Sequence, residues 1–327
     1  MSELHKFIFE GQPVRGMLVR LTDSWQEVLR RRDKAQDAFA PPVRNLLGEM
    51  AAATVLMQAN IKFDGALILQ MHGDGPVKLA VAQVEPDLSF RVTAKVLSEV
   101  EPDDRLEALM NVRGQGRCAI TLDPKVKKPG QQPYQGIVSL DGHGADGERL
   151  PFQQLGQVLG NYMLQSEQLD TQLILAADDR LAAGLLIQRL PALGIANLSG
   201  ARDEDGIGIN EAYNRIAHLA ATLTRDELLS LDVEAILRRL FWQEPLRRFA
   251  PMRGMNGPRF ACTCSREHVG HMLRGLGRAE VDDIVAEQGR AEIGCEFCGL
   301  KYHFDSVDVG GLFTPLKNQL PGSSTIN

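Results

Sequence analysis

The chain has 327 residues, of which 44% are hydrophobic and 24% are charged, and its net charge is −6. This composition is typical of a globular protein with at least one sizeable core. The acidic balance argues against a general binder of nucleic acid or of anionic membranes, which normally carries a basic surface. The first residues lack a signal-peptide pattern, and the apolar run 66–71 is far too short to span a bilayer. We therefore expect a cytoplasmic protein without nucleic-acid or membrane partners.

The first 200 residues mix strands with a few helices. A helical region is expected over 24–60, with a second half that begins at Pro41 and Pro42 and is apolar enough to be buried, and another helix around 151–165. Short turns such as 72–75 join neighbouring strands, which favours antiparallel pairing and an α+β fold rather than a regular βαβ alternation. The strand-like segments are 4–10, 14–21, 65–71, 76–84, 88–96, 118–123, 136–141, 171–177 and 182–190.

A polar, glycine-rich stretch at 199–208 indicates a boundary, and two amphipathic helices are expected after it. Thr224 and Asp232 are candidate N-caps, and Pro245 should end the second helix. Neither helix can bury its apolar stripe alone, so each must lie on another surface. Ordinary core packing is the simplest interpretation of both stripes. The first stripe comprises Ile209, Ala212, Tyr213, Ile216, Leu219, Ala220 and Leu223, and the second Leu229, Val233, Ile236, Leu237, Leu240 and Phe241.

Four of the five cysteines lie close to the C-terminal end. They form a C-x-C pair, Cys262 and Cys264, and a C-x-x-C pair, Cys295 and Cys298. Two such pairs offer the four thiolates of a tetrahedral zinc site. Two short helices, 265–273 and 279–288, are expected between the pairs, with short strands at 260–264 and 300–305. A domain this small has little core, so a metal ion would help to hold it together.

The residues alone leave the role of the metal open. In a four-thiolate site the sulfurs lie only about 4 Å apart, so oxidation to disulfides needs little local motion and would remove the ligands. A purely structural zinc ion and a redox switch are both compatible with this pattern. His268, His271 and His303 lie near the thiols, but three thiolates with one imidazole are the less common alternative. The fifth cysteine, Cys118, is expected to be a small buried hydrophobic residue.

The segment 142–147 matches the G-x-G-x-x-G pattern of dinucleotide-binding folds. In such folds an acidic residue ends the second strand, whereas Glu167 precedes the strand expected at 171–177. No regular βαβ series surrounds the glycines, so we interpret the segment as a polar loop. The sequence contains no convincing Ser/His/Asp, zinc-protease or P-loop pattern, and we expect no enzymatic activity.

The spacing of Cys262, Cys264, Cys295 and Cys298 resembles that of the heat shock protein 33 family, the redox-regulated 33-kDa chaperonins. Segments 134–140 and 162–176 also resemble parts of that family, so the similarity covers nearly the whole chain. Segment 199–214 and the tail after Phe313 match none of its motifs. The resemblance implies three parts: an α+β core at 1–200 that binds clients, a helical linker at 201–255, and a zinc-binding redox sensor at 256–327.

The resemblance also implies a function. The family consists of ATP-independent holdases that are inactive when reduced and bound to one Zn²⁺. Oxidation produces two disulfides, here Cys262–Cys264 and Cys295–Cys298, with loss of zinc, unfolding of the linker, binding of unfolding client proteins and homodimer formation. Carried onto this chain, the candidate residues of the switch and client surface are Tyr213, Ile216, Leu219, Leu223, Val233, Ile236, Leu237, Leu240 and Phe241.

Two alternatives come from other functional classes. The first is a constitutive protein-binding module whose zinc ion is purely structural. The second is a thiol-disulfide oxidoreductase, which normally places an exposed C-x-x-C at the start of a helix in a thioredoxin-like fold. The strand-like surroundings of Cys295 and Cys298 disfavour the second alternative.

Overall fold

The computed structural model describes residues 1–127, 130–144, 146–190 and 210–314. Contacts divide the chain into two compact units. Unit 1 consists of Met1–Arg30 and Ala38–Ala261, and unit 2 consists of Arg31–Asp37 and Cys262–Asn327. Helix α1 (Asp23–Lys34) has residues in both units. Each unit is described by itself.

Unit 1 contains two six-stranded sheets built largely from hairpins. The strand order of the first sheet is β10-β11-β2-β1-β12, with β13 also paired to β1, and that of the second sheet is β14-β5-β4-β3-β6-β7. All of these strand pairs are antiparallel except β14 with β5. The α+β class expected from the sequence is therefore confirmed. The long strands are β1 (Glu3–Phe9), β2 (Val14–Leu21), β3 (Gly65–His72), β4 (Val77–Val84), β5 (Ser89–Val96), β6 (Arg117–Pro124), β7 (Tyr134–Ser139), β10 (Thr171–Ala177) and β11 (Ala182–Arg189).

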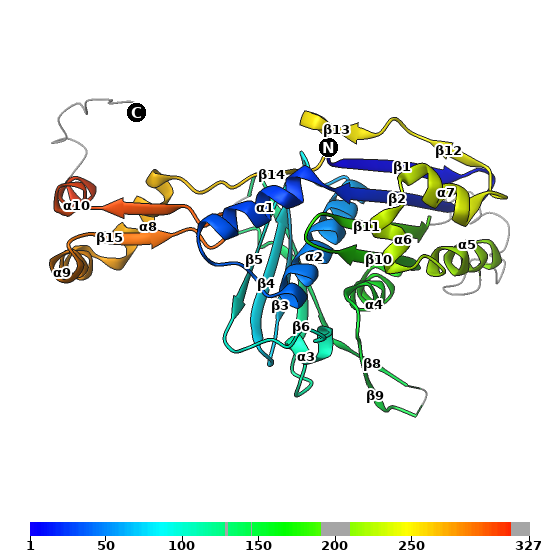
Figure 1. The fold of residues 1–327 in the computed structure, drawn as a ribbon, viewed down its shortest axis with the longest axis horizontal. Coiled ribbons are helices and arrows are strands. Elements are labelled where there is room, and N and C mark those ends of the chain that lie inside the picture. Colours follow the sequence, from blue (N-terminus) through cyan, green and yellow to red (C-terminus); the bar gives the residue numbers. More distant parts are fainter. Residues whose placement is uncertain (128–129, 145, 191–209, 315–327) are drawn as a thin grey trace. The chain divides into compact units, whose positions relative to one another are not determined.

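Helix α2 (Pro41–Asn60) packs against both sheets and forms the centre of the main core (Figure 1). Prolines occupy its first turn, where their missing N–H groups cost nothing. The helix is apolar on all sides, as expected for a helix that protein surrounds. Gly48 allows a close approach, because a Cβ atom at this position would lie only 2.4 Å from the Cβ of Ala177. The expected buried second half of the 24–60 region is confirmed.

The linker region forms three short helices, α5 (Glu211–Ala221), α6 (Arg225–Ser230) and α7 (Val233–Phe241). The expected caps are confirmed, since Thr224 accepts a hydrogen bond from the N–H of Glu227 and Asp232 one from Ala235. The prediction of one helix over 229–241 was wrong. Leu231 is extended, with φ −83° and ψ 152°, and separates α6 from α7. The helix α7 ends at Phe241, before Pro245.

Three short strands follow α7 along the edges of the two sheets. Strands β12 (Leu246–Arg248) and β13 (Met252–Arg253) pair with β1, and β14 (Arg259–Phe260) pairs with β5. The chain therefore occupies one edge of each sheet before it reaches the first cysteine of the C-x-C pair, two residues after β14. The short lengths of β13 and β14 leave few backbone hydrogen bonds in these pairings.

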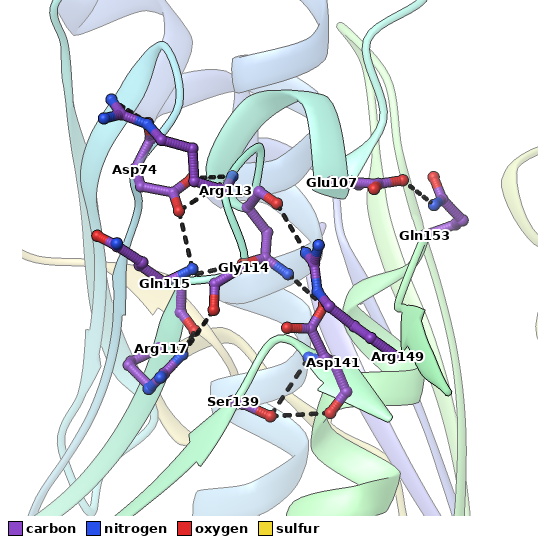
Figure 2. Close-up of polar contacts among 12 residues, drawn as sticks. Asp74, Glu107, Arg113, Gly114, Gln115, Arg117, Ser139, Asp141, Arg149 and Gln153 are labelled. Carbon is purple, nitrogen blue, oxygen red and sulfur yellow. Dashed lines mark hydrogen bonds and ion pairs between the residues drawn. The ribbon is translucent and has the colours of Figure 1, made fainter. Parts of the chain in front are cut away.

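The glycine motif at 142–147 belongs to a hairpin of β8 (Asp141–His143) and β9 (Arg149–Pro151), not to a strand that leads into a helix. Asp141 is buried and receives hydrogen bonds from Asn111 (2.7 Å) and Arg149 (2.9 Å), as part of the polar network of Figure 2. The network ties the hairpin to the segment after α3 (Leu106–Met110). Asp141 forms an ion pair with Arg149, while Asp74 and Arg117 bond to backbone groups, which supports a structural role. Helix α4 (Leu155–Glu167) follows.

Unit 2 contains one hairpin, β15 (Ala291–Gly294) with β16 (Lys301–Phe304), and the helices α8 (Arg266–Leu276), α9 (Arg278–Gln288) and α10 (Ser306–Phe313). The two helices and the second strand expected here are confirmed. The strand expected at 260–264 is limited to β14, and Cys262 and Cys264 lie outside it. Among the described residues of this unit, the buried apolar core comprises Val269, Leu273, Val281, Ala291, Phe304 and Val309.

Some sequence-based predictions concern segments outside the described residues. These are the boundary at 199–208, Ile209 of the first stripe, and the tail from residue 315 onward. The division into parts at 1–200, 201–255 and 256–327 stays a prediction.

Candidate metal and redox site

Local backbone structure brings the two cysteine pairs of unit 2 together. Cys262 and Cys264 precede α8, which begins where the hydroxyl of Ser265 accepts a hydrogen bond from the N–H of His268 (3.1 Å). Cys295 and Cys298 lie in the tight connection between β15 and β16. There the Cys295 carbonyl accepts a hydrogen bond from Gly299 N–H (2.8 Å), and Gly299 adopts φ +68°, which glycine tolerates best.

The four sulfur atoms all lie within 4.8 Å of one another. The sulfurs of Cys262 and Cys295 are 3.6 Å apart, those of Cys264 and Cys298 are 3.4 Å apart, and all four are free thiols. A tetrahedral zinc ion with Zn–S bonds of about 2.3 Å separates its sulfurs by about 3.8 Å. The donor set therefore fits a four-coordinate, thiolate-binding metal ion.

The protonation of the cluster reflects its crowding. The hydrogen bond between the sulfurs of Cys262 and Cys295 lowers the pKa of Cys262 and raises that of Cys295 to about 12. Burial is the main cause that raises the pKa of Cys298 to about 11. Sulfurs this close cannot all become anionic unless a cation compensates their charge, so the cluster holds either protons or a metal ion.

Hydrogen-bond donors surround the sulfurs. Three of the sulfurs receive backbone N–H groups: Cys262 from Cys264, Cys295 from Phe297 and Cys298, and Cys298 from Leu300. The sulfur of Cys264 accepts a hydrogen bond from the hydroxyl of Tyr302 at 3.2 Å. That hydrogen bond is the main cause that raises the pKa of Tyr302, so the phenol keeps the proton that it donates. The sequence did not predict this contact.

The remaining candidate ligands lie apart from the sulfur cluster. Within the described ranges, the group of possible metal ligands contains the four cysteines and none of the three histidines. His268, His271 and His303 are exposed, and His303 contacts Glu292 at 3.3 Å. Cys118 is completely buried in β6, and its burial raises the pKa of its thiol to about 12. It is a core residue, as expected from the sequence.

The linker candidates form a second cluster, within unit 1. They pack on the face of the first sheet that points away from α2, together with apolar side chains of β1, β2, β10 and β11. Leu219 is partly buried and the other eight candidates are buried. The sheet residues that these side chains cover were not predicted from the sequence. Strand β11 is buried at each of its positions. Its apolar sequence without alternation could have indicated a sheet that is covered on both faces. The covered residues are Phe7, Phe9, Val14, Leu18, Ala176, Leu181, Ala183, Leu185 and Ile187.

In the described part of the chain, each helix is too short or too polar to cross a lipid bilayer.

Comparisons with known proteins agree over nearly the full length. The model of the Hsp33 protein family matches residues 2–305. The 33 kDa chaperonin of Chromobacterium violaceum is 44% identical over 312 residues, which cover 95% of this chain and 94% of that protein. The 33 kDa chaperonin of Methylobacillus flagellatus is 41% identical over 316 residues, or 96% of this chain and 94% of that protein.

Among solved structures, the 33 kDa chaperonin of Thermotoga maritima is similar in fold, with a TM-score of 0.70 and 19% identity over 95% of this chain and 97% of that one. The extent of the family match and the identity to the two chaperonins show that this chain belongs to the Hsp33 family.

Proposed function

We propose that the protein is a redox-regulated, ATP-independent holdase of the cytoplasm, which binds unfolding proteins and keeps them from aggregating without catalysing a reaction. The observation that carries this proposal is the cluster of four reduced sulfurs within 4.8 Å of one another in a unit with a very small core. In the reduced state Cys262, Cys264, Cys295 and Cys298 would hold one Zn²⁺. The bound ion would cross-link the two ends of the unit, and it would compensate the charge of four thiolates.

Oxidation would act directly on these ligands. Two thiolates give up two electrons to a peroxide, one S–S bond forms, and the peroxide takes up two protons and becomes two molecules of water. Two such events consume all four ligands, so the unit loses the cross-link on which a domain with six buried core residues depends.

We propose the pairs Cys262–Cys264 and Cys295–Cys298, although close contacts in the reduced cluster also join Cys262 to Cys295 and Cys264 to Cys298. The reason is chain entropy. Once the unit opens, sulfurs two or three residues apart stay close to each other, whereas sulfurs more than thirty residues apart separate. The short pairs are therefore favoured in the unfolded unit.

The linker would connect this event to client binding. Strands β13 and β14 have two residues each, and β14 ends two residues before Cys262, so both are weak attachments once unit 2 unfolds. Release of α5, α6 and α7 would expose two apolar surfaces, the helix stripes and the sheet face beneath them. Apolar surface of this kind binds unfolding proteins and also promotes self-association, which fits homodimer formation on activation.

The deciding experiment measures light scattering from a thermally unfolding client protein. The client is mixed with this protein either reduced and zinc-loaded or oxidised with peroxide at raised temperature. Suppression of aggregation only by the oxidised form supports the proposal.

Equal suppression by both forms supports the second candidate, a constitutive binding module with structural zinc. That candidate is favoured by large apolar side chains that are exposed in the reduced structure near the end of the linker, notably Trp242 and Met255, at 73% and 79%.

A further inference from the structure

The four sulfurs of the cluster differ in the origin of their hydrogen bonds. Backbone N–H groups donate to Cys262, Cys295 and Cys298, and such donors are present whatever the side chains are. The sulfur of Cys264 lies 3.4 Å from that of Cys298 and accepts a hydrogen bond from the hydroxyl of Tyr302 at 3.2 Å. This hydrogen bond depends on one side chain, so a single substitution can remove it.

The position of Tyr302 on β16 explains how the hydroxyl reaches the sulfur. Alternate residues of a strand share a face, so Tyr302 lies on the same side as Phe304, and both rings pack in the small core of unit 2. Lys301 and His303 are on the other face and contact Glu292 at 2.7 and 3.3 Å. Each face is thus held by its own contacts, and the strand keeps the tyrosine ring in place.

We propose that Tyr302 sets the reactivity of Cys264, and through it the oxidant threshold of the cluster. The residue acts through the sulfur and is a positioning residue. A donated hydrogen bond draws negative charge away from the sulfur lone pair and makes the thiolate a weaker nucleophile. Without this hydroxyl, Cys264 should therefore react faster. The proposal deepens the proposed redox function and rests on it only for the role of the thiols as the sensor.

The reaction that Tyr302 slows is the first oxidation step. A thiolate sulfur attacks one oxygen of a hydroperoxide, the O–O bond breaks, and hydroxide or alkoxide leaves while the sulfur becomes a sulfenic acid on protonation. A second thiolate then attacks this sulfur, an S–S bond forms, and the sulfenic oxygen leaves as water once protonated. In both steps the attacking atom is a thiolate, so a donor that stabilises the Cys264 thiolate lowers its rate in each.

The test compares the full-length, reduced and zinc-loaded protein with its Tyr302→Phe variant. This substitution keeps the ring in the core and removes only the hydroxyl. Iodoacetamide is added in a time course, and peptide mass spectrometry gives a separate alkylation rate for each cysteine. We expect Cys264 to react roughly three- to tenfold faster in the variant, where tenfold corresponds to about 1.4 kcal/mol of activation free energy. The other three cysteines should stay within about twofold of their original rates, and peroxide should release zinc faster.

Tyr134→Phe is the matched control, because it removes a hydroxyl that donates to Glu167 in unit 1. It should leave all four rates unchanged. An unchanged rate at Cys264 in Tyr302→Phe would overturn the proposal. So would an equal acceleration at all four cysteines, since that pattern reports a loosened domain rather than a lost hydrogen bond. The alkylation readout needs no client protein, so failure of the holdase experiment and failure of this one are distinguishable.

Discussion

Leu237 offers the most direct test of the idea that the linker helices cover a client-binding surface. Its side chain is 4% exposed and packs between α7 and the first sheet. Leu237→Glu removes roughly 2 to 3 kcal/mol of apolar burial and places a carboxylate where the docked helix offers it no partner, so the docked state should lose at least about 4 kcal/mol. That loss raises the undocked fraction about a thousandfold. Leu237→Ala should cost the docked state about 2 to 5 kcal/mol and is expected to have a weaker effect.

The assay uses the reduced, zinc-loaded variant without oxidant. We expect Leu237→Glu to suppress aggregation of a heat-unfolded client, and hydrogen exchange should show lost protection over α5 to α7. Arg238→Glu is the control, because it introduces the same side chain at an exposed position of the same helix. Aggregation that proceeds unhindered although the helices exchange freely would falsify the assignment of this surface to client binding. Helices that stay protected would refute the burial argument itself.

Four further outcomes are expected. Arg20→Met should lower the temperature at which the linker helices lose protection from hydrogen exchange. Arg20 donates hydrogen bonds to the carbonyls of Leu228 (3.0 Å) and Leu231 (2.6 Å), and each such bond contributes about 1.5 to 3 kcal/mol. An unchanged temperature would contradict this prediction. A strong zinc chelator should abolish the NMR dispersion of unit 2 while unit 1 keeps its own, and joint loss would show that the units are not independent. Peptide mapping of the peroxide-treated protein should find disulfides within each cysteine pair, and bridges between the pairs would refute the entropic argument. Burial raises the pKa of Glu49 from 4.5 to about 8, so between these pH values the native state keeps a proton that the unfolded chain releases. The free energy of unfolding, measured by urea titration, should therefore fall as pH rises from about 5 to 8, by at most about 1.4 kcal/mol per pH unit. Glu49→Gln should flatten this slope.

The sequence predicted the strands and the buried central helix because their patterns are local. Alternation marked strands such as β1, and the charge-poor run that begins at Pro41 indicated a helix with protein on all sides. Thr224 and Asp232 were recognised as caps for the same reason. The break at Leu231 was missed, since an apolar residue there continues the stripe although its backbone is extended.

Long-range partners could not be derived in this way. The local sequence of β1 does not indicate that Phe7 and Phe9 pack against α7. In the structure, the rings of Phe9 and Phe241 pack edge to face with their centroids 5.0 Å apart. The spacing of the cysteines predicted which four sulfurs lie together, because two such pairs are typical of a four-thiolate metal site. The hydroxyl of Tyr302 was not predictable, since its contact with Cys264 depends on the register of β15 and β16.

The first sheet joins parts of the chain that are synthesised far apart in time. Strand β2 pairs with β11, and Arg15 hydrogen-bonds to Gln188 across 173 residues of sequence. At about 5 to 20 residues per second, a ribosome needs on the order of 10 to 30 s to supply the missing strand. Throughout that interval the hairpin of β1 and β2, which is apolar on both faces, has neither its sheet neighbour nor its linker cover. A protein that we propose to protect unfolding chains thus exposes apolar surface of its own while it is being synthesised.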